Sequence, residues 1–214
     1  MGGPPPDPFP AVKTDVKFIT CSTCKLLAKR LHSQMSKWDS KVTKSEEAMQ
    51  AKLADMCVVS SDEGSWITEY DMVESKDGKA IELKRQNEAG ACEVECKTIV
   101  EACKMVVQEA ELELAAGLYK SFNGKKKKPL DLKALTSKLC TSDDAWAANV
   151  EGGCAAGVPK VPKKRKAGPA FRPKPVPPPP PPPPEKDVGA EAAPQKDAEV
   201  AAAPKENAEA NAEL

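Results

Sequence analysis

The sequence has few of the side chains on which most enzyme sites depend. Aromatic residues make up 4% of the 214 residues, and His32 is the single histidine. One histidine and no Gly-x-Ser-x-Gly run give no sign of a Ser-His-Asp hydrolase. A zinc site is not predicted either, because Cys21-x-x-Cys24 has no second Cys-x-x-Cys pair to complete four ligands. We therefore predict a protein that is not an enzyme and that uses no metal or cofactor.

Long apolar segments are also missing. No run approaches the roughly 20 apolar residues that a membrane-spanning helix needs, and the first residues, MGGPPPDPFPAVK, lack the apolar centre of a signal peptide. The chain nevertheless has eight cysteines, all between positions 21 and 154. An even number of cysteines in a small region is typical of a disulfide framework made in an oxidising compartment. We expect the endoplasmic reticulum lumen or secretion, with a leader that this sequence does not include.

Charge is balanced overall but not along the chain. The net charge is zero, and residues 1–157 carry 22 basic and 24 acidic side chains. Residues 158–176 then carry seven basic side chains and no acidic ones, and residues 185–214 carry three basic and eight acidic ones. This is not the broad basic face of a nucleic-acid-binding domain, so no nucleic-acid partner is expected. The run Pro162–Lys166 resembles a nuclear-import signal, which makes a nuclear or cytoplasmic location the alternative.

The composition divides the chain into three parts. Residues 1–13 are a flexible Pro-rich lead, residues 14–157 hold the foldable domain, and residues 158–214 are a basic, polyproline and acidic Ala-rich tail. The tail has Phe171 as its single aromatic residue, so we predict that it is disordered. Eight prolines at 177–184 would form a polyproline II rod about 25 Å long. The last residues, Asn211–Leu214, only approximate a retrieval signal, and their role stays open.

Apolar residues recur at helical spacing in four segments of the domain. They are residues 15–38, 44–56, 90–119 and 131–139, and Asp15 is a suitable N-cap for the first. Residues 58–90 break this period. Asp77-Gly78 favours a tight turn there, with Val73 before it and Ile81 and Leu83 alternating after it, which predicts a small β-hairpin. The fold class is therefore mainly α, with four to five helices and a hairpin insertion.

The order of the cysteines resembles the saposin-like framework. Cys21-x-x-Cys24 begins the first helix, Cys57 ends the second, Cys103 lies in the third, and Cys140 and Cys154 follow the fourth. Spacing alone leaves 15 pairings of these six cysteines open. The resemblance implies the pairs Cys21–Cys154, Cys24–Cys140 and Cys57–Cys103. Cys92 and Cys96 are additional and are each other's natural partners, which predicts a distorted helix start at Ala91–Glu95.

The residues around the cysteines are similar to those of the Canopy family. The similar runs are Leu53–Cys57, Trp66-Ile67, Gly90-x-Cys92-x-x-x-Cys96-Lys97-Thr98-Ile99-x-x-x-Cys103, Leu118-Tyr119-Lys120 and Leu139-Cys140. Canopy proteins are saposin-like proteins of the endoplasmic reticulum or secretory path. The resemblance implies a cofactor that helps chaperones to mature cell-surface or secreted proteins, with client or chaperone polypeptides as partners.

Two other functions stay open. A saposin-like domain can bind lipid, although the dense charge and the hairpin insertion speak against this here. Cys21-x-x-Cys24 at a helix start could also be the site of a thiol oxidoreductase, but the chain lacks the βαβ context of such enzymes. For the polypeptide-binding function, we predict a contact surface near the hairpin that includes Trp66, Tyr70, Val73 and Ile81. The client and the oligomeric state cannot be predicted.

Overall fold

Helices dominate the part of the chain that the structure, a computed structural model, describes. The described residues are 8–124, 129–141, 147, 149–163, 165, 168 and 171–174. The chain divides into two compact units, Met1–Val176 and Pro177–Leu214, and all described residues belong to the first. The polyproline run, the acidic tail and Asn211–Leu214 lie outside the described residues.

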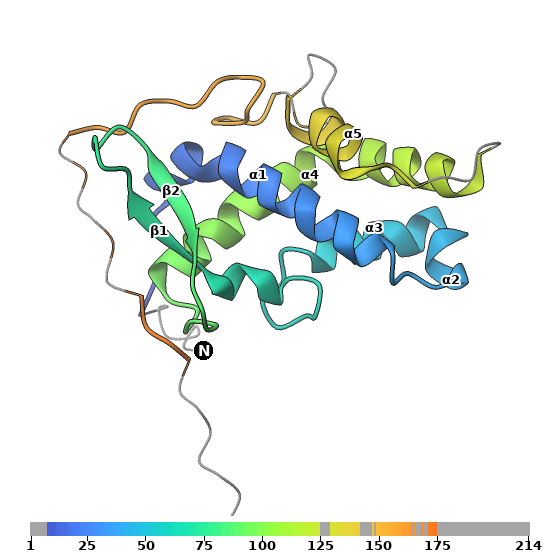
Figure 1. The fold of residues 1–214 in the computed structure, drawn as a ribbon, viewed down its shortest axis with the longest axis horizontal. Coiled ribbons are helices and arrows are strands. Elements are labelled where there is room, and N and C mark those ends of the chain that lie inside the picture. Colours follow the sequence, from blue (N-terminus) through green and yellow to red (C-terminus); the bar gives the residue numbers. More distant parts are fainter. Residues whose placement is uncertain are drawn as a thin grey trace, which may run out of the picture. The chain divides into compact units, whose positions relative to one another are not determined.

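The two longest helices form the centre of the fold. Helix α1 spans Lys13–Met35 and α4 spans Val94–Asn123, and they pack against each other along much of their length (Figure 1). At about 1.5 Å per residue, α4 is about 45 Å long. The apolar side chains that recur at helical spacing meet between them: Leu27, Leu31, Ile99, Leu114 and Leu118 are almost completely buried. The predicted helical period therefore marks the core side of both helices.

Shorter helices cover the central pair. Helix α2 spans Ser40–Thr43, α3 spans Glu46–Asp55 and packs against α4, and α5 spans Leu132–Thr136 and packs against α1. Each begins at a side-chain cap: Asp39, Ser45 and Asp131 accept hydrogen bonds from backbone N–H groups of the first turn. A π-helical turn, η2 (Ser137–Thr141), extends α5 so that Leu139 reaches the core.

The structure contains the predicted β-hairpin. A 3-10 turn, η1 (Ser65–Glu69), leads into β1 (Tyr70–Glu74), which pairs antiparallel with β2 (Ile81–Arg85). Gly78 lies in the turn at a φ of 65°, a left-handed conformation that glycine adopts without strain. Met72 and Ile81 lie on the buried face, so the hairpin closes one end of the helical core.

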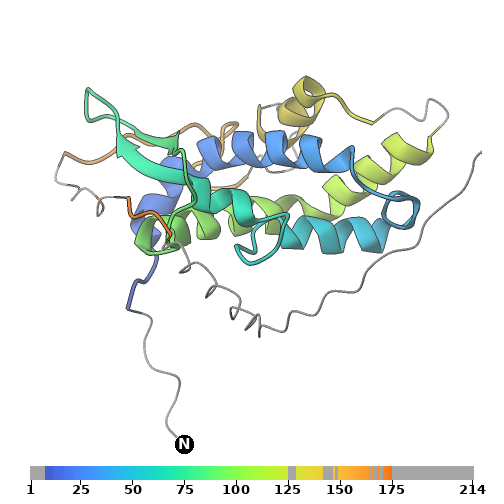
Figure 2. The ribbon, with the colours of Figure 1, turned by 60° about the horizontal axis from the view of Figure 1, so that its bottom comes forward.

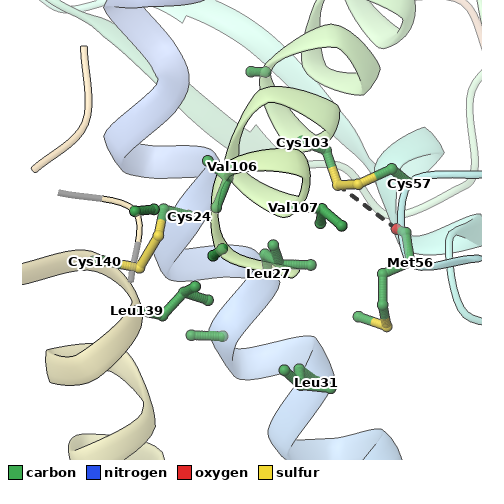
Figure 3. Packing of buried hydrophobic residues seen from close by; sticks show 14 of the residues in the cluster. Cys24, Leu27, Leu31, Met56, Cys57, Cys103, Val106, Val107, Leu139 and Cys140 are labelled. Carbon is green, nitrogen blue, oxygen red and sulfur yellow. Dashed lines mark hydrogen bonds between the residues drawn. A yellow bond between two sulfur atoms is a disulfide. The ribbon is translucent and has the colours of Figure 1, made fainter. Parts of the chain in front are cut away.

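Four disulfides connect the elements. Three of them join the pairs that the saposin-like resemblance implies, and the fourth joins the additional pair. Cys24–Cys140 ties α1 to η2, and Cys57–Cys103 ties the segment just after α3 to α4 (Figure 3). Cys21–Cys154 ties α1 to the segment that follows η2. The carbonyl oxygen of Met56 lies 3.8 Å from the Cys103 sulfur. That sulfur carries no hydrogen in a disulfide, so this is a packing contact.

The fourth disulfide joins Cys92 to Cys96 at the beginning of α4. The helix begins at Val94, so Cys92 precedes it and Cys96 lies in its first turn. The predicted distortion at Ala91–Glu95 is therefore right for its first half. Glu93 occupies the N-cap position without a side-chain capping bond.

Two predictions need correction. Asp15 is not the N-cap of α1: Val12 holds that position, and Asp15 lies in the first turn, only 6% exposed. The domain also does not end at residue 157. The described residues of 158–174, which we call the strap, contact the hairpin, the beginning of α1 and the beginning of α4. Both differences have the same physical cause. Arg165 of the strap forms an ion pair with Asp15 and covers it.

Candidate functional site

The predicted contact surface is partly core. Trp66 is 3% exposed, and its indole N–H donates a hydrogen bond of 3.0 Å to the carbonyl oxygen of Met56. Ile81 is also 3% exposed and lies on the buried face of β2. Neither residue can bind a partner directly, so this half of the prediction is wrong. The large apolar side chains close the gap between the hairpin and the helices instead.

The other two predicted residues are accessible. Val73 is exposed on the outer face of β1, and Tyr70 is half-buried with its ring against that of Trp66, 6.0 Å between centroids. Tyr70 borders two depressions of the surface. One, of about 190 Å³, lies between α1, η1 and β2, and its rim includes Lys29, Arg30 and Arg85. The other lies beneath the strap.

The strap passes over three elements in turn. Near its start, Val161 is buried, and its N–H donates to the carbonyl oxygen of Lys79 at the tip of the hairpin. Gly168 lies against the carboxyl group of Glu95: a Cβ at Gly168 would come within 1.8 Å of an oxygen of that group. Figure 2 shows the last described residues, in orange, beside the beginning of α4. The strap thus contacts the rest of the domain at several separate points.

Arg165 anchors the middle of the strap. Its Nε lies 2.9 Å from the carboxylate of Asp15 in α1, and its Nη1 lies 2.9 Å from the carboxylate of Glu74 in β1. The Arg165 and Asp15 side chains are 7% and 8% exposed, so this ion pair is largely shielded from water. Arg165 belongs to the run Pro162–Lys166 that resembles a nuclear-import signal. An import receptor could not reach this side chain while the strap is docked.

The end of the strap pairs with the segment before α4. The N–H of Ala91 donates to the carbonyl oxygen of Arg172, and the N–H of Lys174 donates to the carbonyl oxygen of Ala89, both at 2.9 Å. Gly90 and Pro173 thereby form an antiparallel β-bridge. We call residues Ala89–Glu93 the docking edge. It holds a short extended polypeptide by its backbone.

Two side-chain contacts add to this pairing. The ring of Phe171 lies directly on Gly90: a Cβ at that position would come 2.6 Å from the ring. The guanidinium of Arg172 lies 3.6 Å from the carboxylate of Glu93 and is 65% exposed. A depression of about 30 Å³ remains under the segment, bordered by Thr68, Tyr70, Asp71, Ala91, Glu93, Glu95, Cys96, Phe171 and Arg172. Because this space is small, the strap and the docking edge fit together closely.

An acidic pair lies beside the docking edge. The pKa of Glu95 is raised from 4.5 to about 8. Burial is the largest cause, and a hydrogen bond with the Asp71 side chain is the second. Two other groups lower this pKa: the N–H of Met72, which donates a hydrogen bond of 3.1 Å to Glu95, and the positive charge of Arg165. Burial and the acidic neighbour outweigh them. Glu95 is therefore protonated at neutral pH and can donate a hydrogen bond to Asp71.

Sequence reasoning missed the residues of the docking edge and the strap. The composition of residues 158–214, with its single aromatic residue, predicts disorder, and the sequence around Gly90 gives no sign that another segment pairs with it. One signal was available. Phe171 is the single aromatic residue in 57 otherwise aromatic-free positions, 158–214, and a lone aromatic in such a segment is a candidate for a docking contact.

The cysteines and acidic groups show no other kind of site. All eight cysteines are in disulfides, so Cys21 and Cys24 hold no resting thiolate. Within the described part of the chain, no group of three or more Cys, His, Asp or Glu side chains is placed to hold a metal ion. No helix in that part is both long enough and apolar enough to span a bilayer.

Comparison with protein-family models, curated proteins and solved structures finds no match for this chain. The resemblance to Canopy proteins therefore stays a prediction.

Proposed function

We propose that the protein is a non-enzymatic polypeptide-binding module of the secretory pathway, which acts as a cofactor of chaperones on cell-surface or secreted proteins. One observation carries this proposal: the docking edge holds the extended residues Phe171–Lys174 through two backbone hydrogen bonds. Backbone pairing of this kind accepts many sequences, because it uses groups that every residue has. A chaperone cofactor needs such tolerance, since its clients differ in sequence.

The disulfides support the compartment part of the proposal. Four disulfides, among them one with a sequence separation of 133 and one with a separation of 116, are compatible with a secretory or extracellular environment. The saposin-like and Canopy assignments belong to the same proposal. They draw support from the pairing of the cysteines and from the mainly helical fold.

The alternative of lipid binding has less support from the geometry. A saposin-like domain that takes up lipid must offer an apolar interior to acyl chains. Here the apolar sides of α1, α3 and α4 are closed on one another, and Leu27, Leu53 and Leu114 are at most 1% exposed. The large apolar side chains that are exposed among the described residues come from five separate segments, and only Phe9 and Val12 share one: Phe9, Val12, Val58, Val73, Leu112 and Val158.

A direct binding assay tests the proposal. The full chain would be titrated into a fluorescently labelled, reduced and carboxymethylated polypeptide, which stays unfolded without denaturant, and anisotropy would be recorded. We expect saturable binding to the unfolded polypeptide and none to the same polypeptide in its native, oxidised form. In parallel, flotation with vesicles of phosphatidylcholine and phosphatidylglycerol should leave the protein unbound at neutral and at acidic pH. Vesicle binding without binding of the unfolded polypeptide would reverse the order of the two functions.

A further inference from the structure

We propose that the docking edge, Ala89–Glu93, selects extended segments in which an aromatic residue is followed by arginine and proline, and that the chain's own Phe171-Arg172-Pro173 is an internal competitor for such segments. This inference rests on the proposed function and adds to it a sequence preference and a mode of regulation. The observations that carry it are the contacts between the docking edge and the strap.

The backbone pairing explains why proline is accepted. Ala91 and Ala89 bond to Arg172 and Lys174, the residues on either side of Pro173. Pro173 itself therefore faces Gly90 as a pair without its own hydrogen bonds. Proline lacks an N–H, so this is the position of a paired segment at which proline costs no hydrogen bond. A proline one residue later, at the Lys174 position, would remove the donor to Ala89.

Gly90 explains the preference for an aromatic residue. The Phe171 ring occupies the space that a side chain at position 90 would fill, with ring atoms 2.6 and 2.7 Å from the site of a Cβ. An aliphatic residue of similar length lacks the flat face that can lie against a backbone so closely. The glycine thus makes a shallow aromatic site on the docking edge.

Charge explains the preference for arginine after the aromatic residue. Glu93 lies 3.6 Å from the Arg172 guanidinium and is 20% exposed, whereas Arg172 is 65% exposed. An exposed pair of this kind contributes little affinity, but an acidic residue in place of Arg172 would meet like charge. Glu93 therefore contributes more to the selectivity of the docking edge than to its affinity.

The strap is held so that its end can leave while its middle stays. Arg165, which makes the shielded ion pair with Asp15 and a more exposed one with Glu74, precedes Phe171 by six residues. The pairing at the docking edge consists of two backbone bonds, one ring contact and one exposed ion pair. A tether of this length gives the strap's end an effective concentration of about 1 mM or more at the docking edge. A segment from another polypeptide must overcome this concentration, which makes the strap an internal regulator.

The test uses a labelled peptide of residues 168–176, GPAFRPKPV, and the full chain in two forms. One is the natural chain and the other is a release variant, Phe171→Ser with Arg172→Glu, whose strap no longer fits the docking edge. We expect the release variant to bind the peptide at least about tenfold more tightly than the natural chain, as measured by anisotropy. Equal binding by both forms would overturn the role of the strap as competitor.

Changes in the peptide test the preference without any risk to folding. Methylation of the Lys174 nitrogen removes the donor to Ala89 and should abolish binding to the release variant. Methylation of the Phe171 nitrogen, which is in neither backbone bond to the edge, is the matched control and should leave binding unchanged. Peptides with Phe171→Ala or Arg172→Glu should bind at least about tenfold and about threefold more weakly. Full binding by the Ala peptide, or by the Lys174-methylated one, would refute the assigned site.

One protein variant separates this inference from the proposed function. Gly90→Val, added to the release variant, places a side chain where the aromatic ring lies and should abolish peptide binding while the circular dichroism spectrum stays helical. If this variant still binds the unfolded polypeptide with unchanged affinity, the docking edge is not the client site and this inference fails, whereas the proposed function then rests on the measured binding alone. If no form binds any unfolded polypeptide, the proposed function itself fails. A release variant that doubles its mass in light scattering would assign the edge to a second copy of the chain and overturn the proposal.

Discussion

Replacement of Arg165 by methionine should detach the strap and lower the stability of the domain. The methionine fills a similar volume but leaves the carboxylate of Asp15, 8% exposed, without its partner. Two charge-assisted hydrogen bonds of 2.9 Å are lost, each worth about 1.5–3 kcal/mol. Removal of one partner of a buried ion pair costs about 3–5 kcal/mol in general.

The expected loss lies below that general value. The strap can lift from the domain, after which water reaches Asp15, so the penalty cannot exceed the free energy that holds the strap. The contact with Glu74 also counts for less, because that side chain is 40% exposed. We expect a loss of about 2–3 kcal/mol in the free energy of unfolding, which corresponds to a decrease of about 4–12 °C in Tm.

Urea unfolding followed by circular dichroism measures this loss, and limited proteolysis measures detachment. The variant should be cut within the strap at protease concentrations that leave the natural chain intact. Arg172→Met is the matched control: it removes an arginine from the same strap, but its ion pair is 3.6 Å long and exposed, so the loss should stay under about 0.5 kcal/mol. Equal stabilities of the two variants, or protection of the strap in Arg165→Met, would refute the role of Arg165 as anchor.

Three further predictions follow from the structure. Because the pKa of Glu95 is raised from 4.5 to about 8 in the fold, its contribution to stability is fully present below pH 4.5 and is lost as the pH rises through 8. The Glu95→Gln variant should therefore show a flatter Tm between pH 5 and 8 in scanning fluorimetry. Gly152→Ala should cost more than about 2 kcal/mol in urea unfolding, because φ is 73° and the new Cβ would lie 1.9 Å from a carbonyl oxygen of α1. Replacement of both Cys57 and Cys103 by alanine opens a loop with a sequence separation of 46 and should cost about 4 kcal/mol in the same assay.

Each of these has a result that would contradict it. A parallel pH profile of Glu95→Gln and the natural chain would show that the carboxyl group titrates normally. Gly157→Ala is the control for Gly152→Ala: it shares a positive φ of 85° but meets no atom within 4 Å, so equal losses would refute the argument from close approach. Removal of the Cys57–Cys103 disulfide at a cost under about 1 kcal/mol would indicate that the unfolded chain is already compact.

The helices and the hairpin could be predicted because they depend on local patterns. The apolar period of α1, α3 and α4 is repeated over several turns, and Asp77-Gly78 marks the turn between β1 and β2. Even so, the ends of these elements differ from the prediction by up to four residues: α4 spans Val94–Asn123, whereas the prediction was 90–119. The prediction for α1 ended at Trp38, whereas the helix ends at Met35.

The site could not be predicted to the same extent, because it depends on contacts between distant residues. Asp15 and Arg165 are 150 residues apart, and no local sequence pattern around either residue predicts that the two are in contact. A hairpin insertion favours exposed positions for Trp66 and Ile81, but both are buried in the structure. The alternation of Ile81 with Glu82 in β2 already indicated a buried face, and the length of the hairpin decides which residues reach it.

The two disulfides of α1 also set an order of events during synthesis. Cys21 and Cys24 emerge early, but their partners Cys154 and Cys140 follow 133 and 116 residues later. At 5–20 residues per second, Cys21 waits roughly 7–27 s for its partner, while Cys92 and Cys96 can join almost at once. During that interval Cys21 and Cys24 are free to form a temporary bond with each other or with Cys57. Wherever such a temporary bond forms, disulfide isomerisation must remove it before Cys21 and Cys24 can join their partners and fix the N-terminal helix in place.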